Sequence, residues 1–128
     1  MKVVAVLAAL VITYFVVVIS FGLGVGQSGG DGRSAEIVLQ DLRFVPNRLD
    51  AKVGVPLTVR LTNSGTERHD LNFESLHMPG LEGIESILEP GETRTITLRF
   101  DTPGVHTFIC TLPGHAAVGM TGAAFVRP

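Results

Sequence analysis

The amino-acid sequence predicts an all-β fold, a β-sandwich, preceded by one N-terminal transmembrane helix. Two observations indicate the sandwich. Apolar and polar side chains alternate over several short segments, and turn residues separate these segments at intervals of about ten residues. A third observation indicates the helix, because an uncharged apolar stretch covers residues 3–25.

The segment 1–26 is predicted to be a membrane anchor or a signal segment. As an α-helix, residues 3–25 would extend for roughly 34 Å, which is enough to cross a hydrocarbon core of about 30 Å. The apolar part of a secretory signal is shorter, about 7–15 residues, so we favour a retained anchor over a cleaved signal. Either alternative exports the rest of the chain, and Lys2 favours an inside N-terminus. We expect a single-pass protein of the cell membrane with its folded domain on the extracytoplasmic face, periplasmic or outer.

The rest of the chain divides into a linker and one domain. Residues 27–34 are small, polar and rich in glycine, which is typical of a flexible linker. Residues 35–128 are long enough for one sandwich domain. The net charge of -2 gives no indication of nucleic-acid binding. The single cysteine excludes an internal disulfide, a four-cysteine zinc site and a dinuclear centre that needs two thiolates.

Alternation of apolar and polar residues predicts the strands of this domain. In 55–62, valine and leucine occupy every second position, as expected for a strand with one buried face. Residues 74–92 are irregular because proline and glycine interrupt them, and one helical turn is predicted within 81–88. The predicted strands in chain order are 36–44, 55–62, 69–73, 94–100, 105–110 and 123–126.

The loop 104–122, GVHTFICTLPGHAAVGMTG, contains the most specific chemistry. An apolar strand ends at Cys110, and His115 and Met120 follow at equal spacing. The Pro113-Gly114 turn can bring His115 back beside Cys110. Each residue alone has an ordinary structural interpretation, but thiolate, imidazole and thioether together suit copper. Two histidines, one cysteine and a weak axial methionine describe a blue-copper electron-transfer site.

The second imidazole is predicted to be His69, which follows a turn and begins a predicted strand. His106 shares a strand face with Phe108 and is expected to be semi-buried with its own hydrogen bond, and His77 is expected in an exposed loop. Both remain alternatives to His69. The predicted metal ligands are therefore His69, Cys110, His115 and Met120, and the predicted cofactor is one copper ion.

The stretch FICTLPGHAAVGM resembles the copper loop of the cupredoxins, the small blue copper proteins, and NSGTERHD resembles the turn before their first histidine ligand. The spacing Cys-x4-His-x4-Met is similar to that of auracyanins, and its first half to that of azurins; plastocyanins are a further resemblance. The resemblance covers about residues 35–126. It implies a Greek-key, cupredoxin-like sandwich that holds type 1 copper, with His69, Cys110 and His115 in plane and Met120 axial. It also implies an electron carrier between larger redox complexes, not an enzyme.

Two positions depart from the family pattern. Asp70 stands where the family usually has asparagine, and Arg68 stands where azurins have a glycine. The Asp70 carboxylate can accept a hydrogen bond from the Thr111 hydroxyl, so the clamp between the two ligand segments can be retained. An unpaired negative charge at this position would stabilise Cu(II) and lower the reduction potential.

Two surfaces are candidates for partner recognition. We expect an edge of the His115 ring to emerge through small apolar residues, namely Leu112, Pro113, Ala116, Ala117 and Val118. A run of acidic residues is either a recognition patch for a basic partner or an ordinary solvated face. It comprises Asp70, Glu74, Glu82, Glu85, Glu89 and Glu92. The expected partners are redox proteins, such as membrane electron-transfer complexes or cytochromes, and the membrane through the N-terminal helix.

Three alternatives to an electron carrier remain open. A copper-binding protein could deliver or store metal at the extracytoplasmic membrane face, although the chain contains only three methionines. A copper domain of an enzyme would need further histidines for a catalytic centre. Zinc could also occupy a site of two histidines and one cysteine.

Overall fold

The computed structural model describes residues 34–128. The predicted anchor or signal segment 1–26 lies outside the described residues, and so does almost all of the predicted linker 27–34. Among the described residues, no helix has the length and apolar character required to cross a bilayer.

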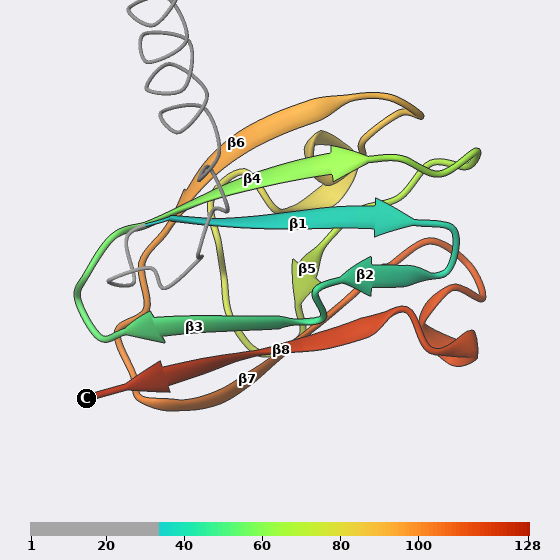
Figure 1. Cartoon of the computed structure of the whole chain (residues 1–128). Coiled ribbons are helices and arrows are strands. Elements are labelled where there is room, and N and C mark those ends of the chain that lie inside the picture. Colours follow the sequence, from blue (N-terminus) through green and yellow to red (C-terminus); the bar gives the residue numbers. More distant parts are fainter. Residues whose placement is uncertain (1–33) are drawn as a thin grey trace, which may run out of the picture.

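Two four-stranded sheets pack face to face, which confirms the predicted all-β sandwich (Figure 1). One sheet has the order β2-β1-β4-β6 and the other β3-β8-β7-β5. Strand β1 lies parallel to β4, and β3 lies parallel to β8, whereas the other pairs are antiparallel. The bounds are β1 Ser34–Gln40, β2 Arg43–Val45, β3 Arg48–Lys52, β4 Leu57–Asn63, β5 Asn72–Phe73, β6 Thr93–Leu98, β7 Gly104–Ile109 and β8 Thr121–Arg127.

The strands form where the sequence alternates, because every second side chain enters the space between the sheets. In β4 the apolar positions are buried and the intervening positions are exposed or half-buried. Edge-to-face aromatic pairs fill the centre of the core, with Phe108 against Phe44 and Phe73 at ring-centroid distances of 5.2 and 5.7 Å. Gly122 in β8 is required here, since a Cβ atom would lie 2.4 Å from the Phe108 ring.

The segment predicted as one strand, 36–44, is a hairpin. Strand β1 ends at Gln40, the chain turns at Asp41 and Leu42, and β2 returns antiparallel to β1. Leu42 has a φ of 66°, a left-handed conformation that is rare for a leucine and that apolar alternation does not reveal. Strand β3, whose five residues alternate between exposed and buried, is not among the predicted strands.

The predicted strand 69–73 is shorter than expected, with only Asn72 and Phe73 in β5. His69 instead forms an isolated bridge with Leu88, in which their peptide groups exchange two hydrogen bonds of 3.2 and 2.8 Å. The predicted helical turn is confirmed as a short 3-10 helix, η1 (Gly83–Ser86). Arg94 of β6 donates hydrogen bonds to the carbonyl oxygens of Glu85 and Ile87, which attaches the η1 segment to the sandwich.

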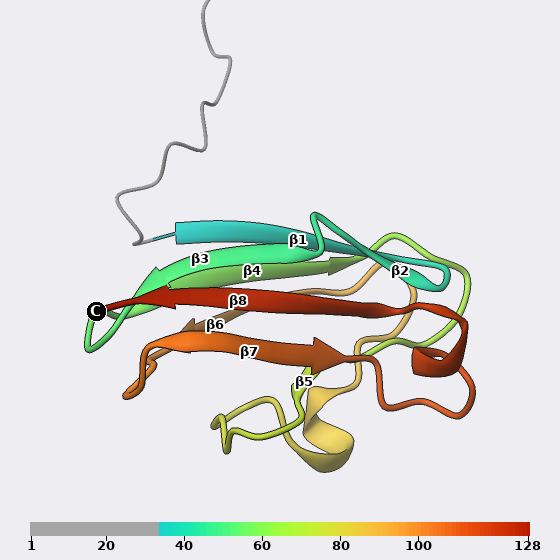
Figure 2. The same cartoon turned by 90° about the horizontal axis from the view of Figure 1, so that it is seen from below.

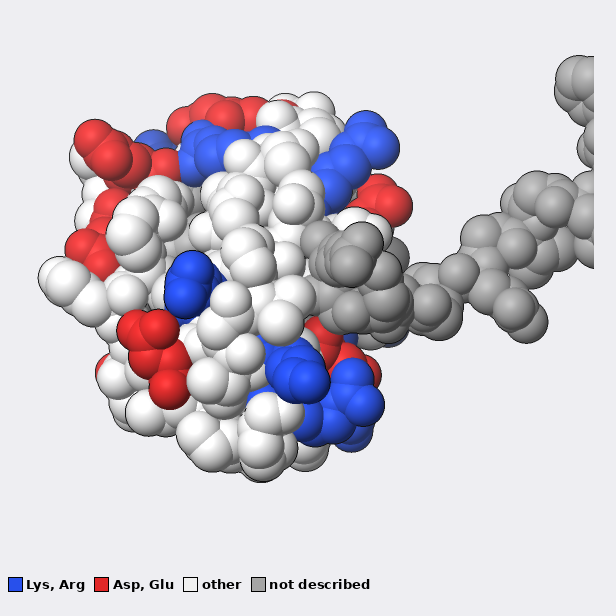
Figure 3. Space-filling view, turned by 90° about the vertical axis from the view of Figure 1, so that its left-hand side faces the viewer, with Lys and Arg blue, Asp and Glu red and all other residues white. Residues whose placement is uncertain are grey.

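Three connections meet at one end of the sandwich: the β1–β2 turn, the chain after β4, and the loop between β7 and β8 (Figures 1 and 2). The β7–β8 loop contains a second 3-10 helix, η2 (Ala116–Val118). The opposite end, where β8 and the chain terminate, displays lysine or arginine and acidic side chains intermixed around an uncharged band (Figure 3). The predicted metal ligands belong to two of the three connections named above, because His69 follows β4 and the other three lie between β7 and β8. They therefore lie at the first end.

Candidate metal centre

The β7–β8 loop folds back on itself and carries three of the four predicted ligands. The Met120 peptide N–H donates to the His115 carbonyl and the Cys110 N–H donates to the Met120 carbonyl, each at 3.1 Å. Gly114 and Gly119 have φ values of 82° and 108°, so these two tight bends need residues without a Cβ atom. The bends and the backbone hydrogen bonds bring His115 beside Cys110.

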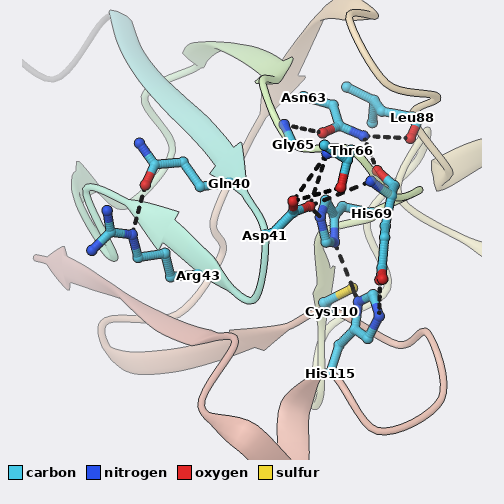
Figure 4. A network of polar contacts seen from close by, with 11 residues as sticks. Gln40, Asp41, Arg43, Asn63, Gly65, Thr66, His69, Leu88, Cys110 and His115 are labelled. Atoms are coloured by element: carbon cyan, nitrogen blue, oxygen red, sulfur yellow. Dashed lines mark hydrogen bonds and ion pairs between the residues drawn. The ribbon is translucent and has the colours of Figure 1, made fainter.

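The side chains of His69, Cys110 and His115 converge (Figure 4). The Nδ1 atoms of the two histidines are 3.2 Å apart, and Cys110 Sγ lies 3.4 Å from His115 Nδ1. One donor atom from each residue lies within 4.8 Å of the other two, which makes this the one cluster of metal-ligand type among residues 34–128. The geometry thus brings together three predicted ligands from two distant segments of the chain.

The two predicted sulfur ligands are fully buried. Cys110 and Met120 have no exposed surface, and Met120 is adjacent to Cys110 through the backbone hydrogen bond. Burial raises the pKa of the Cys110 thiol, and the charge of Asp70 acts in the same direction. A cation is therefore required to hold this sulfur as a thiolate at neutral pH.

Asp41 fixes the orientation of the His69 ring. Its Oδ1 atom lies 3.0 Å from His69 Nε2, and the carboxylate also accepts hydrogen bonds from the Thr66 peptide and hydroxyl and from the Glu67 peptide. These contacts hold the pKa of the Asp41 carboxyl well below its usual range, with the His69 contact as the largest cause. Gly65 makes this approach possible, since a Cβ atom there would lie 2.3 Å from Asp41 Oδ1 and 3.0 Å from His69 Nε2.

Glu67 contacts the Nε2 atom of His115, as Asp41 contacts that of His69. Its Oε2 atom lies 3.1 Å from His115 Nε2, and the side chain of His115 is 13 % exposed. The predicted edge of the ring therefore reaches the surface, but a carboxylate lies against it. This contact was not predicted from the sequence.

Asp70 is buried and joins the two ligand-bearing segments. Its carboxylate accepts hydrogen bonds from the Thr111 peptide at 2.6 Å, from the Thr111 hydroxyl, from Asn72 Nδ2 at 3.0 Å and from Ser86 Oγ at 3.3 Å. The predicted clamp between Asp70 and Thr111 is confirmed. Arg68 does not pair with Asp70, because its guanidinium lies 3.6 Å from Glu89 instead.

The other two histidines lie outside the cluster. His106 donates from Nε2 to the Thr102 carbonyl oxygen at 3.0 Å and stacks on Phe100, which is the semi-buried arrangement predicted for it. His77 is an exposed loop residue with Nδ1 2.8 Å from Glu82. Neither approaches Cys110 within the cluster, so the structure favours His69 over both alternatives.

The acidic run predicted as one surface is not uniform. Asp70 is buried in the hydrogen-bond network above, and three glutamates have cationic or histidine neighbours: Glu82 with His77, Glu89 with Arg68, and Glu92 with Arg94. The interpretation as a continuous recognition patch for a basic partner loses its support. The pairing explains why, since arginine side chains compensate the charges of Glu89 and Glu92.

Sequence reasoning missed the two carboxylates that contact the histidines. Asp41 lies in a turn that the analysis placed inside a strand, so no signal located it beside His69. Glu67 lies two residues before His69 in the segment NSGTERHD. The sequence shows that it is close to His69, but not that its side chain points towards His115.

The comparison with protein-family models identifies one family. The model described as a cupredoxin-like domain matches residues 8–120, which is most of the chain. Among characterised proteins, auracyanin-B of Chloroflexus aurantiacus is 42 % identical over 43 residues, which cover 34 % of this chain and 18 % of the relative. The copper-resistant cuproprotein CopI of Pseudomonas aeruginosa is 24 % identical over an alignment that covers 80 % of each protein. This chain thus spans only a small part of the auracyanin-B relative.

Solved structures share the fold. A reduced auracyanin from Roseiflexus castenholzii superposes with a TM-score of 0.66 at 23 % identity, covering 77 % of this chain and all of that one. A multicopper oxidase superposes with a TM-score of 0.63 at 26 % identity, but this chain spans only 44 % of it. The sandwich described above is therefore the architecture of both single-domain and multidomain proteins.

Proposed function

This chain belongs to the cupredoxin-like family, and from that premise we propose that it is a type 1 copper protein that carries single electrons between redox partners. The observation that carries the proposal is the convergence of His69 Nδ1, Cys110 Sγ and His115 Nδ1 within 4.8 Å. Met120, buried against the same loop, is proposed as the weak axial ligand.

The donor set fits a soft metal cation. Carboxylates only accept hydrogen bonds, so Asp41 and Glu67 place the proton of each histidine on Nε2. Both Nδ1 atoms then present lone pairs to each other across 3.2 Å, which is repulsive unless a cation accepts them. The buried thiol beside them becomes a thiolate under the same condition. Bound copper would supply the one-electron couple between Cu(I) and Cu(II).

The surrounding residues supply rigidity and exclude water. His69 is held by its backbone bridge to Leu88 and by its Nε2 contact with Asp41. Cys110 and Met120 are buried, so water does not reach the sulfur side of the site. Because little can move when the charge changes, the reorganisation that accompanies electron transfer is small. His115, the one cluster residue that is partly exposed, is the proposed exit for the electron.

A second candidate function is copper handling without electron transport. The similarity to a copper-resistant cuproprotein over 80 % of each protein favours this alternative. Such a protein needs to release its metal, whereas buried Cys110 and Met120 favour retention. The multicopper oxidase similarity concerns one domain of a longer protein, and the single cluster within residues 34–128 suits a carrier with one copper.

We further propose, from the sequence alone, that residues 3–25 tether the domain to the extracytoplasmic face of the cell membrane, where it exchanges electrons with membrane complexes or cytochromes.

An absorption spectrum with a redox titration tests the proposed function. Copper-loaded protein should be intensely blue from the Cys110 thiolate and should cycle reversibly between two oxidation states, and Cys110→Ser should be colourless. A protein that binds copper without colour and transfers it rapidly to a chelator would favour copper handling. A protein that retains only zinc would contradict both proposals.

The role of Met120 has a separate test. Met120→Leu should keep a blue, copper-loaded site and raise the reduction potential, because the axial sulfur is the weak ligand that stabilises Cu(II). Potentiometry and the copper content per chain measure both effects. Complete loss of copper would show that the axial assignment is wrong.

A further inference from the structure

The exit surface consists of the exposed edge of His115 and the neighbouring residues Pro113, Ala117 and Val118, and the Glu67 carboxylate adds a negative charge to it. We propose that this surface recognises a redox partner through a cationic group, which pairs with Glu67 while apolar surface of the partner covers the surrounding residues. The inference rests on the proposed electron-carrier function and specifies which partner chemistry the exit surface accepts.

The loop that carries His115 contributes no acidic or basic side chain of its own. No Asp, Glu, Lys or Arg occurs from Thr102 to Val126. Three small apolar residues next to His115 are exposed, namely Pro113, Ala117 and Val118, the last at 64 %. The Glu67 carboxylate touches the His115 ring in the midst of this surface, and the Asp41 carboxylate on the neighbouring His69 ring has the same sign. The local charge is therefore negative and favours the approach of a cationic group.

The structure holds Glu67 in this position from its backbone. Its peptide N–H donates to Asp41 Oδ1 at 3.3 Å, and its carbonyl accepts from Asn63 Nδ2 at 2.8 Å. Its side chain is 62 % exposed, and within the described residues its one ion-pair partner is His115, through Oε2. The neighbouring Arg68 is directed to Glu89. The Glu67 carboxylate is therefore preorganised and able to receive a second, external cation.

The physical effect of such a contact is on association more than on affinity. A charge at the rim of an interface steers encounter and makes the rate depend on ionic strength, whereas exposed ion pairs add little to binding. The apolar residues around His115 supply a small contact area, which suits a transient redox complex.

Two oxidants of opposite charge test the proposal with full-length, copper-loaded, reduced protein. Each oxidant takes one electron from the protein, so that Cu(I) becomes Cu(II) while cobalt(III) becomes cobalt(II) or iron(III) becomes iron(II). Tris(1,10-phenanthroline)cobalt(III) is a cation with an apolar surface, and hexacyanoferrate(III) is an anion. In Glu67→Gln we expect the rate with the cobalt complex to fall about threefold to fivefold at 0.1 M salt, and the rate with hexacyanoferrate(III) to rise.

The opposite direction of the two changes is the diagnostic result. A shift of the reduction potential would move both oxidation rates in the same direction, whereas a local charge moves them in opposite directions. Glu36→Gln is the matched control, since Glu36 is an exposed glutamate in β1 near the end of the sandwich away from the site. It removes the same net charge and should leave both rates nearly unchanged.

Binding to the metal-free protein gives a readout that does not depend on electron transfer. Tris(1,10-phenanthroline)chromium(III), a redox-inert paramagnetic cation, should broaden the amide resonances of Glu67, Ala117 and Val118 first, and Glu67→Gln should weaken this broadening. Unchanged rates and unchanged broadening in Glu67→Gln would overturn the proposal while leaving a blue, redox-active protein intact. A colourless protein would instead refute the proposed function.

Discussion

At the scale of single residues, the Asp41 carboxylate determines how His69 presents itself to a metal. The contact with Nε2 leaves Nδ1 as the free donor atom, and the Thr66 and Glu67 hydrogen bonds keep the carboxylate from turning away. Outer contacts of this kind fix both the tautomer and the orientation of a ligating histidine. Asp41 is therefore a positioning residue that acts through His69.

Removing this contact should weaken copper binding. We expect Asp41→Ala to lower the affinity for Cu(II) by about 10–100-fold, a typical effect for the loss of such an outer contact. Asp41→Asn should lower it less, because the amide oxygen can still accept from Nε2. Competition with a chelator of known affinity measures both values. Asp50→Asn, which removes the same charge from an exposed pair with Arg48, is the control, and an equal loss there would contradict the positioning role.

Asp70 illustrates why this chain departs from the asparagine of its family. The Thr111 peptide and the Asn72 amide nitrogen next to its carboxylate can only donate, and the Thr111 and Ser86 hydroxyls donate to it as well. A carboxylate can accept from all four groups, whereas an asparagine at position 70 would have one acceptor atom fewer. The carboxylate is thus well matched to its neighbours. Its buried negative charge also lies beside Cys110 and opposes reduction of a bound metal ion.

We expect Asp70→Asn to raise the reduction potential, because Cu(I) becomes more favourable by on the order of 1 kcal/mol when the adjacent negative charge is removed. The double variant Asp70→Asn with Asn72→Asp exchanges the two groups and should return the potential towards the original value. Voltammetry of the three proteins provides the measurement. A potential that stays constant in the single variant would show that this charge is fully compensated.

At the residue scale, the predicted metal ligands could be selected from the sequence, but the side chains that contact them could not. Cys110, His115 and Met120 are close along the chain, and a tight glycine-containing loop keeps their side chains close together in space. His69 could be selected because it follows a turn. The contacts of Asp41 and Glu67 depend on how separate loops meet, and neither spacing nor composition carries that information.

At the scale of structural elements, Asn63 at the end of β4 fixes the connection that carries His69. It is fully buried, donates from Nδ2 to the carbonyls of Glu67 and Leu88 at 2.8 and 3.0 Å, and accepts from the Gly65 peptide at 2.9 Å. The Asn63 side chain thus joins the segment before His69 to Leu88, the residue whose backbone pairs with that of His69. The turn predicted at 63–65 is supported by this side chain.

Asn63→Ala should destabilise the metal-free protein by about 2–3 kcal/mol, because it leaves buried backbone groups without partners. Denaturant unfolding followed by circular dichroism gives the value. Asn47→Ala, at an exposed position, should change the stability by less than about 0.5 kcal/mol. Equal stabilities for the two variants would contradict the proposed role of Asn63.

Most elements with regular alternation were predictable, with the short strand β3 as the exception, and elements defined by a turn were not. The strands over 55–62, 94–100, 105–110 and 123–126 occur close to their predicted positions because each has one buried and one exposed face. The hairpin within 36–44 escaped prediction because Leu42 continues the apolar pattern while its backbone reverses direction. The predicted strand 69–73 is mostly a single bridge, since Asp70 is turned into a polar network.

At the scale of the whole molecule, the sequence predicts a retained membrane anchor. The full chain should stay in the membrane fraction after an alkaline wash, and its intact mass should include residues 3–25. A variant that begins after residue 26 should be recovered without the membrane fraction. A mature protein whose mass lacks these residues would establish the cleaved-signal alternative.

The chain enters and leaves the sandwich at the same end. Strand β1 begins at Ser34 and runs towards the copper loops, and β8 runs back from those loops to the terminus beyond Arg127 (Figure 1). A bead or an electrode joined at Pro128 would consequently hold each molecule with His115 facing the bulk solution. Immobilised protein should for this reason exchange electrons with dissolved mediators more readily than by direct contact with the solid to which it is fixed.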